Sequence, residues 1–305
     1  MSRTVITLLA AVAAAGSLAR AEQQGRGETP APFPLSNAIR ERGSSVTGAF
    51  EGWYYDRDGS PNLLVGYFNR NTKQELDIPI GPNNRIEPGG PDRGQPTHFL
   101  ASRQWGVFSI RIPKDFGTRE LTWTLRVNGQ TNTITLHTRP DWILAPFEDP
   151  ANRNTPPVLR FAPAAAAFSG PPSGVAAAYT TSVGVPLPLT VWAADEGPKI
   201  NVPDAAPARN RSRGSPNAPP APPPLSVAWS VFRGPGAVTF ENAKPSIDKA
   251  NGGRTTTTAA FGAPGEYVLR VQANDSTGDG GGGFQCCWTN ALVAVSVSGS
   301  TATVY

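Results

Sequence analysis

The side chains best suited to acid–base chemistry in this sequence are carboxylates in its first third. A glycoside hydrolase needs two such groups, one on each side of the scissile bond. Turn positions and solvent-facing strand ends explain the same residues without chemistry, since an acidic residue in a D-R-D-G-S-P run is typical of a turn. A hydrolase is therefore the alternative function. It requires that His98 and the carboxylates lie together in one pocket, and these carboxylates are Glu51, Asp56, Asp58, Glu75 and Asp77.

Metal ligands and activated nucleophiles are poorly represented. The two histidines, His98 and His137, have no partner at ligand spacing, and zinc needs three or four converging ligands. No G-x-S-x-G run is present. The Asp56–Gly59 run resembles the start of a calcium loop but lacks the later ligands. A second acidic group could form at one end of a sandwich from Asp195, Asp275 and Asp279. We expect no cofactor and no metal.

Two adjacent cysteines, Cys286 and Cys287, are the only ones in the chain. Neighbouring Cα atoms lie about 3.8 Å apart across a trans peptide, whereas unstrained disulfides prefer about 4.4–6.8 Å. A vicinal disulfide, two thiols and an intermolecular link all remain open. The apolar positions change parity between Trp288 and Val293, which predicts a bulge or an irregular lead-in to the strand there.

Aromatic residues are concentrated in the first half of the chain. Adjacent aromatics in a strand point to opposite faces, so Trp53 and Tyr54 cannot share one core. One interpretation is a strand buried on both faces and covered by the Pro/Gly loop that follows. The other is an exposed platform for a saccharide or protein ligand, formed by Trp53, Tyr54, Tyr55, Tyr67 and Trp105.

The hydrophobic pattern predicts an all-β protein with two antiparallel β-sandwich (or small barrel) domains. In residues 47–147, short strands alternate with turns, and Asn128-Gly129 between 121–127 and 131–136 predicts a hairpin. Residues 81–97 are rich in proline and glycine and are expected to form an irregular loop. Residues 148–175 are expected to be a Pro/Ala-rich linker.

The second domain, residues 176–305, contains the clearest strand patterns. Tyr267, Leu269, Val271 and Ala273 alternate with more polar residues, and Pro264-Gly265 supplies a turn before them. A tyrosine just after a turn resembles the tyrosine corner of Greek-key sandwiches. The W-S-x-x-x-G-P-G run and the A-P-G-E-Y-V-L-R-V-x-A-N-D run together resemble PKD and related immunoglobulin-like domains of bacterial surface proteins, over about residues 178–298. The Pro-rich insertion 197–224 departs from that family's pattern.

The N-terminus predicts export. Residues 1–21 have a basic residue, a short apolar run and an A-R-A cleavage pattern, which together indicate a secretory signal peptide. Residues 22–46 are expected to be a flexible leader. The formal charge of +4 is scattered along the chain, so nucleic acid is not expected as a partner. No later stretch is apolar enough to span a membrane.

The expected function is therefore non-catalytic. We expect an exported binding or structural protein of the periplasm, cell surface or extracellular space, with a saccharide or an envelope protein as partner. The resemblance to PKD domains implies an interaction module and no particular activity.

Overall fold

The computed structural model describes residues 39–150, 153–197, 225–275 and 286–299, and these residues form an all-β fold. These described residues belong to one compact unit. The predicted signal peptide, most of the leader and almost all of the Pro-rich insertion lie outside the described residues. Among the described residues, no helix is long and apolar enough to cross a bilayer.

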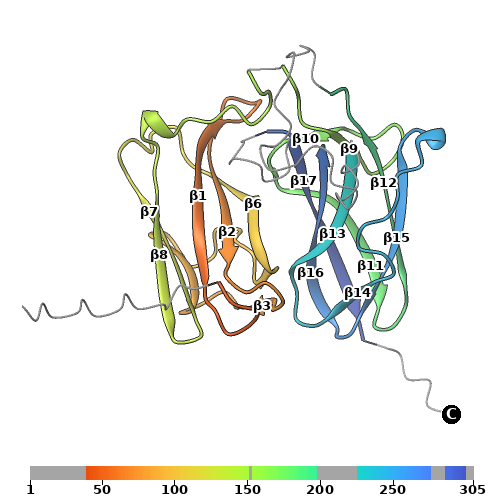
Figure 1. The fold of residues 1–305 in the computed structure, drawn as a ribbon, viewed down its shortest axis with the longest axis horizontal. Helices are drawn as coiled ribbons and strands as arrows, with labels where there is room; N and C mark the ends of the chain where they lie inside the picture. Colours follow the sequence, from red (N-terminus) through yellow and green to blue (C-terminus); the bar gives the residue numbers. More distant parts are fainter. Residues whose placement is uncertain (1–38, 151–152, 198–224, 276–285, 300–305) are drawn as a thin grey trace, which may run out of the picture. The chain divides into compact units, whose positions relative to one another are not determined.

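The N-terminal sandwich consists of two three-stranded antiparallel sheets (Figure 1). The first has the order β1-β2-β6, with β1 (Val46–Tyr55), β2 (Pro61–Asn69) and β6 (Ser102–Arg111). The second has the order β4-β7-β8, with β4 (Asn84–Glu87), β7 (Leu121–Val127) and β8 (Gln130–Leu136). A two-stranded ribbon pairs β3 (Leu76–Asp77) with β5 (His98–Phe99). A short 3-10 helix, η2 (Pro140–Trp142), follows β8.

The hairpin between β7 and β8 forms as its sequence predicts. Asn128 and Gly129 have φ values of 51° and 73°, the left-handed backbone that a two-residue hairpin turn needs. The alternation in β7 buries Leu121, Trp123 and Leu125 between the two sheets. Residues 81–97 differ from the irregular loop that we expected, because they contain β4, which pairs with β7.

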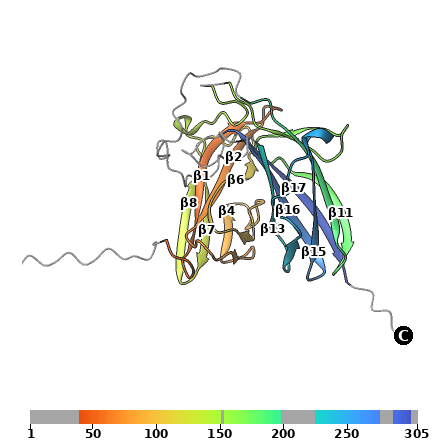
Figure 2. The same ribbon diagram turned by 45° about the vertical axis from the view of Figure 1, so that its right-hand side comes forward.

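The C-terminal sandwich packs a five-stranded sheet against a four-stranded sheet. The first, in the order β10-β9-β12-β15-β14, contains β9 (Val158–Arg160), β10 (Phe168–Ser169), β12 (Leu187–Ala194), β14 (Val238–Phe240) and β15 (Arg254–Phe261). The second, in the order β11-β17-β16-β13 (Figure 2), contains β11 (Val175–Ser182), β13 (Leu225–Arg233), β16 (Gly265–Asp275) and β17 (Trp288–Ser298). A second 3-10 helix, η3 (Lys249–Asn251), precedes β15.

This architecture is an immunoglobulin-like sandwich. Its neighbouring strands are antiparallel except β11, which runs parallel to β17. Residues of β12, β16 and β17 that alternate along each strand, such as Leu189, Leu269 and Val293, form its core. Two sheets that face each other across alternating apolar residues are the basis of the immunoglobulin-like fold.

Tyr267 makes the corner contact that its position predicts. Its buried ring packs beside Phe261, with ring centroids 4.8 Å apart, and its hydroxyl donates to the Ala263 carbonyl at 2.8 Å. Gly234 lies under the ring, where a Cβ would approach to 2.2 Å. The tyrosine therefore fixes the turn before β16 against the one after β13.

We expect Tyr267→Phe to lower the free energy of unfolding by about 1 kcal/mol, because it removes one hydrogen bond and keeps the packed ring. Urea denaturation monitored by circular dichroism measures this change. The matched control is Tyr179→Phe, since Tyr179 is only half-buried. Equal stabilities for the two variants would show that the Tyr267 hydroxyl does not stabilise the corner.

Residues 148–175 differ from the linker that we expected. They contain β9 and β10, which extend the five-stranded sheet through the pairing of β9 with β12. Leu159 of β9 is fully buried in the sandwich core. The leader also differs near its end, where Arg40 bridges to Asn71 and Val46 begins β1.

Of the two irregularities predicted for the last strand, the structure has the irregular lead-in and not the bulge: Cys286 and Cys287 precede β17 outside the regular strand, and the peptide bond between them is cis. β16 and β17 pair from Asn274–Trp288 to Gly265–Val297 without a register shift. Trp288 and Val293 lie on opposite faces of β17, and both faces are buried there. Because the face that carries Trp288 contacts the N-terminal sandwich, the strand needs no bulge.

β17 contacts the N-terminal sandwich through a buried apolar cluster and a side-chain hydrogen bond. The Trp288 indole belongs to a buried cluster with Tyr54, Leu64 and Leu144. Asn290 Nδ2 donates to the Gly106 carbonyl at 2.8 Å. A Cβ on Gly106 would lie 1.9 Å from Trp288 Cη2, so only glycine allows this approach.

Candidate functional site

A groove of about 780 Å³ lies between the β3–β5 ribbon and the turns of the C-terminal sandwich. One wall comes from β3 and β5, and the other from the Gly234–Ala237 turn and the start of β16. Its charged lining residues are Glu75, Asp77, His98, Arg233 and Glu266. Of the residues that the sequence suggested for acid–base chemistry, Glu75, Asp77 and His98 lie in this groove.

His98 lies between two carboxylates on the β3–β5 ribbon. Its Nδ1 is 2.8 Å from Asp77 Oδ1, and its Nε2 is 3.0 Å from Glu75 Oε2. The register of the ribbon creates this arrangement, because Asp77 is directly opposite His98. Both ring nitrogens are therefore engaged.

The electrostatics of this triplet favour the imidazolium form. Burial alone would lower the pKa of His98, but the hydrogen bonds and negative charges of Glu75 and Asp77 outweigh it and raise that pKa. The hydrogen bond from His98 in turn lowers the pKa of Glu75. A histidine with both nitrogens donating has no lone pair for general-base work, and a charge-paired carboxylate is a poor proton donor.

We expect the stabilisation contributed by His98 to depend on pH. A raised folded-state pKa means that this stabilisation is full below the unfolded value, about 6.5, and is lost as pH rises through the folded value. Because the pKa of Glu75 is lowered in the folded chain, the stabilisation that Glu75 contributes is full above the usual carboxylate pKa of 4.5. It is lost only as pH falls through the lowered folded value.

Thermal unfolding of the wild-type chain and of His98→Gln from pH 5 to pH 9 tests this dependence. The difference in midpoint temperature should be largest near pH 5–6 and shrink as pH rises. The remaining charged groups of the groove, Arg233 and Glu266, are unchanged by the variant. A difference that is constant, or that grows with pH, would contradict the triplet.

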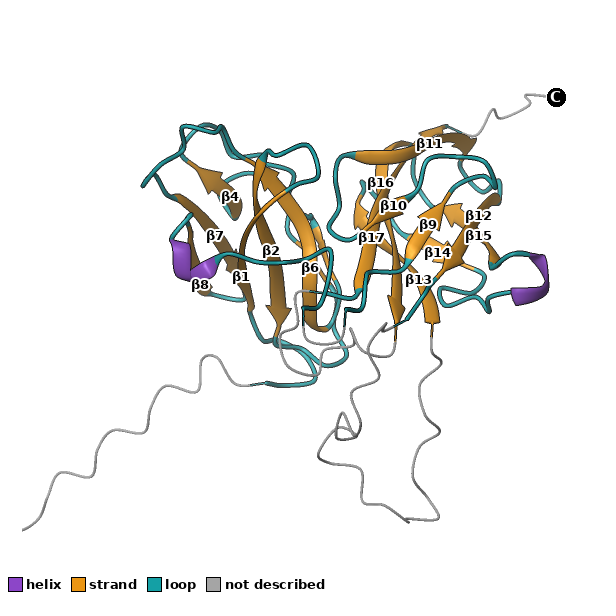
Figure 3. Cartoon of the chain, turned by 90° about the horizontal axis from the view of Figure 1, so that it is seen from above, coloured by secondary structure: helices purple, strands orange, loops and turns teal. Residues whose placement is uncertain are grey.

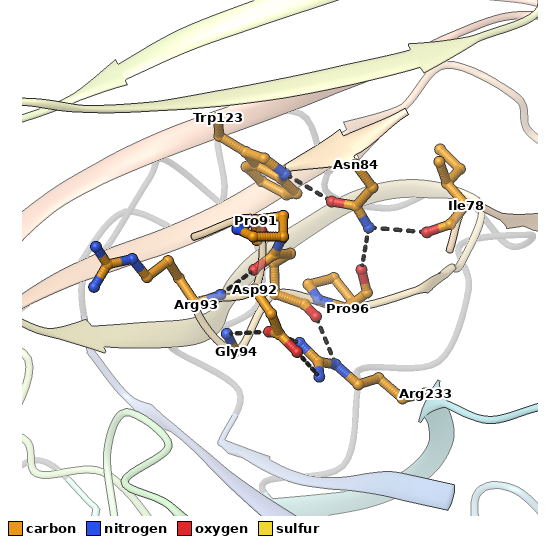
Figure 4. Close-up of polar contacts among 10 residues, drawn as sticks. Ile78, Asn84, Pro91, Asp92, Arg93, Gly94, Pro96, Trp123 and Arg233 are labelled. Atoms are coloured by element: carbon orange, nitrogen blue, oxygen red, sulfur yellow. Dashed lines mark hydrogen bonds and ion pairs between the residues drawn. The ribbon is translucent and has the colours of Figure 1, made fainter. Parts of the chain in front are cut away.

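The opposite wall is held by Arg233, whose guanidinium makes two contacts with Asp92. Its Nη1 is 3.0 Å from Oδ2, its Nη2 is 2.7 Å from Oδ1, and its Nε donates to the Gln95 carbonyl at 2.7 Å (Figure 4). The hydrogen bond from Arg233 lowers the pKa of Asp92. This fork-to-carboxylate geometry is a strong form of ion pair. No sequence pattern predicts this ion pair, since nothing local relates two residues so far apart.

The 79–97 segment, which contains Asp92, is held in place by hydrogen bonds of its own residue Asn84. Asn84 Oδ1 accepts from the Trp123 indole at 3.0 Å, and its Nδ2 donates to the Ile78 and Pro96 carbonyls at 2.9 and 2.8 Å (Figure 4). The side chain of Asn84 is fully buried. One amide thus connects the core tryptophan to the segment that forms one side of the groove.

The other carboxylates do not converge on this groove. Glu51 contacts Arg103 Nη2 at 2.7 Å, and its burial raises its pKa in spite of that charge. Asp58 accepts from Ser60 within its turn and contacts Arg111 at 2.9 Å, and hydrogen bonds from Ser60 lower its pKa to about 2. Asp56 accepts from the Arg57 N–H of the same turn. Of the five, Glu75 and Asp77 alone meet His98.

The five aromatic residues proposed as a platform do not form one exposed surface. Trp53, Tyr54 and Tyr67 are buried, and the Arg103 guanidinium lies 3.8 Å from the centre of the Trp105 ring. Trp53 and Tyr54 join different clusters, as strand alternation requires. The cover over Tyr54 comes from Leu144 and Trp288 instead of the Pro/Gly loop.

A smaller exposed patch remains at the end of β1. Tyr55 is 57% exposed and packs edge-on against Trp53, with centroids 5.3 Å apart. Trp142, 40% exposed, stacks on Phe50 at 5.3 Å. Ile143 bridges to Trp53 and is also exposed. Sequence analysis missed Trp142 and Ile143, because no periodic strand pattern surrounds them.

Cys286 and Cys287 are joined by a disulfide with an S–S distance of 2.10 Å. Both residues are buried at the start of β17, and the peptide bond between them is cis. Their redox state in the protein as it is made by the cell stays a prediction, which intact mass under non-reducing conditions decides.

The second acidic group is only partly described. Burial and then the charge of Asp275 raise the pKa of Asp195, and Asp275 accepts from Asn154 Nδ2 at 2.6 Å. Asp279 lies outside the described residues. Within the part of the chain that the structure describes, no group of three or more acidic, histidine or cysteine residues is arranged to hold a metal ion.

Comparisons with known proteins give no family. No family model matches the chain, and no curated protein matches it. Among solved structures, the chain is similar to domains 4 and 5 of the S-layer protein SbsC, with 12% identity over 84% of this chain and 98% of the other and a TM-score of 0.23. It is also similar to the D00-D0 domain of intimin, with 12% identity over 83% of this chain and 98% of the other and a TM-score of 0.25. The titin Ig tandem domains A164-A165 are similar with 10% identity over 84% of this chain and 98% of the other and a TM-score of 0.22. Similarity at this level is too low to support an inference about this chain.

The immunoglobulin-like description therefore rests on the sheets themselves. The four-stranded and five-stranded sheets, their antiparallel pairing and the corner tyrosine give that architecture directly. The narrower resemblance to PKD domains has no matching family model and stays a prediction.

Proposed function

We propose that this chain is a non-catalytic binding protein of the cell envelope or extracellular space, exported by residues 1–21. The observation that carries the proposal is His98, whose two ring nitrogens are both engaged by carboxylates. The groups that a hydrolase would use are paired with one another, so this site is better suited to recognition than to proton transfer.

The groove fits a basic peptide segment of an envelope protein better than it fits a sugar. Its described lining residues include no aromatic side chain on which a sugar ring could stack. The Gly234-Pro235-Gly236 turn offers backbone groups and a small apolar ring instead. The positive charge of Arg233 is offset by Asp92. Asp77 and Glu75 share the single positive charge of His98, which leaves one negative charge in excess, and their side chains are 77% and 54% exposed.

Fluorescence anisotropy with labelled peptides tests this proposal. One peptide carries lysines, and its counterpart carries glutamates at the same positions. The wild-type chain should bind the lysine peptide at least about tenfold more tightly, about 1.4 kcal/mol. Asp77→Lys should remove that preference, because it reverses a charge that is exposed on the groove wall.

The control is Asp115→Lys, which reverses an exposed charge outside the groove. Equal binding of the two peptides, or equal effects of the two variants, would contradict a basic partner in this groove. Circular dichroism of both variants confirms that each remains folded.

A further inference from the structure

A row of three side chains crosses the outer face of the five-stranded sheet. Trp192 of β12 is directly opposite Arg160 of β9 on one side and directly opposite Arg254 of β15 on the other. Figure 3 shows these three strands side by side. Directly opposite residues have Cβ atoms about 4.5–5.5 Å apart, so the pairing of the strands places Trp192 between Arg160 and Arg254 in this row.

The burial pattern places this row on the side of the sheet away from the core. Val191 and Ala193, the neighbours of Trp192, are buried in the core of the C-terminal sandwich. Trp192 itself is only half-buried, and Arg254 is exposed. Because side chains alternate along a strand, the row must face outward.

The row also lines a hollow. A groove of about 560 Å³ is bounded by Arg160, Trp192 and Arg254 together with Pro163, Asn251 and Gly252. The turn at η3, the short purple helix at the right of Figure 3, contributes the last two. Gly252 has a φ of 67°, and no atom lies within 4 Å of where its Cβ would be, so the turn leaves this side open.

The two arginines differ in their charge environment from the described arginines that form ion pairs. Arg85, Arg103 and Arg111, for example, each contact a carboxylate within 2.9 Å. Within the described residues, neither Arg160 nor Arg254 has an ion pair or a hydrogen bond from its side chain.

The acidic residue that influences Arg254 is already engaged. Asp248 accepts from the Ala250 and Asn251 N–H groups at 3.1 and 3.3 Å, and it caps the η3 turn. Its oxygens therefore accept hydrogen bonds from the turn, and although its charge still acts on Arg254, the guanidinium keeps its fork of donors for another anion.

We propose that this row binds an acidic saccharide, whose sugar ring stacks on Trp192 while its carboxylates pair with Arg160 and Arg254. A guanidinium matches the planar geometry of a carboxylate with two parallel hydrogen bonds. An indole offers an apolar face to the C–H face of a sugar ring. The combination suits a polymer that repeats both features.

The surroundings of the row favour a saccharide over other anionic partners. The next pair along the strands, Thr190 and Thr256, places two hydroxyls 3.0 Å apart on the same face, where they can bind further sugar hydroxyls. A bilayer surface would need exposed apolar side chains at these positions. Nucleic acid would need a longer basic track than two arginines.

This site is separate from the groove beside His98, and either can fail alone. Isothermal titration of the full chain with a tetramer of galacturonic acid measures the affinity. The carboxyl-reduced tetramer, which is neutral, is the comparison. The acidic tetramer should bind at least about tenfold more tightly, about 1.4 kcal/mol, and its affinity should fall as salt rises.

Three variants locate the binding. Arg160→Gln and Arg254→Gln should each weaken the acidic tetramer about tenfold, and Trp192→Ala should weaken both tetramers by at least as much. Arg126→Gln, an exposed strand arginine outside this groove, is the matched control and should have no effect. Thermal unfolding of each variant confirms that it is folded.

Equal affinity for the two tetramers, or affinities that the three variants leave unchanged, would overturn the proposal. Tighter binding of phosphatidylglycerol vesicles or of a single-stranded oligonucleotide would overturn the saccharide assignment. Loss of peptide binding in Asp77→Lys with no saccharide binding in the wild-type chain would reject this inference and leave the proposed function in place.

Discussion

Replacing Trp288 by alanine is expected to lower the free energy of unfolding by about 3–5 kcal/mol, the usual effect of removing a fully buried indole. Trp288 packs against Tyr54, Leu64 and Leu144 of the N-terminal sandwich while its strand belongs to the C-terminal one. The variant therefore removes a contact on which both sandwiches depend. Urea denaturation followed by circular dichroism measures the loss.

Two further variants make this result specific. Gly106→Ala should also destabilise strongly, because it adds a Cβ 1.9 Å from the indole at a φ of 50° that favours glycine. Trp142→Ala, which removes an exposed indole, should cost much less. If Trp288→Ala and Trp142→Ala had equal effects, or if Gly106→Ala were neutral, the contact between β17 and β6 would be contradicted.

Asn84→Ala is expected to lower the free energy of unfolding by about 3 kcal/mol or more, since it leaves three buried polar groups without partners. These are the indole N–H of Trp123 and the carbonyls of Ile78 and Pro96. Loss of the amide should also release the 79–97 segment and weaken the contact of Asp92 with Arg233.

Chemical denaturation and peptide binding by the same variant measure the two effects. The control is Asn83→Ala, whose side chain is exposed, and it should stay within about 0.5 kcal/mol of the wild type. A variant at Asn84 as stable as the Asn83 control would contradict the role of this amide. Unchanged peptide binding by this variant would show that binding in the groove does not depend on the position of the 79–97 segment.

Local patterns predicted the strands that have one buried face. Leu121, Trp123 and Leu125 of β7 alternate into the core, and so do Tyr267, Leu269 and Val271 of β16. The alternation signal exists because one face is buried and the other is polar. It fails for β17 at Trp288, where a second body of protein covers the opposite face.

β9 could not be predicted for a different reason. It has three residues, Val158–Arg160, between prolines and an Ala-rich run, which is too short for a periodic pattern. Its pairing with β12 is a tertiary contact, and that pairing places Arg160 beside Trp192. The Arg160–Trp192–Arg254 row therefore cannot be predicted until the register of the three strands is known.

The candidate site was only half accessible to sequence analysis. Asp77 and His98 were named as chemical residues, but their pairing follows from a two-residue ribbon across the 81–97 segment. Arg233 and Asp92 come from different sandwiches, and their contact depends on how the chain folds over long distances. Side-chain type identified the candidates, and tertiary structure decided which of them meet.

The central claim, binding without turnover, is tested most directly on isolated envelope material. The purified chain is incubated with cell-wall polymer and envelope proteins, and both the retained chain and the soluble fragments are measured over many hours. The account predicts saturable retention with no fragments above the protein-free control. Fragments that accumulate well beyond one per chain, and that Glu75→Gln with Asp77→Asn abolishes, would contradict it.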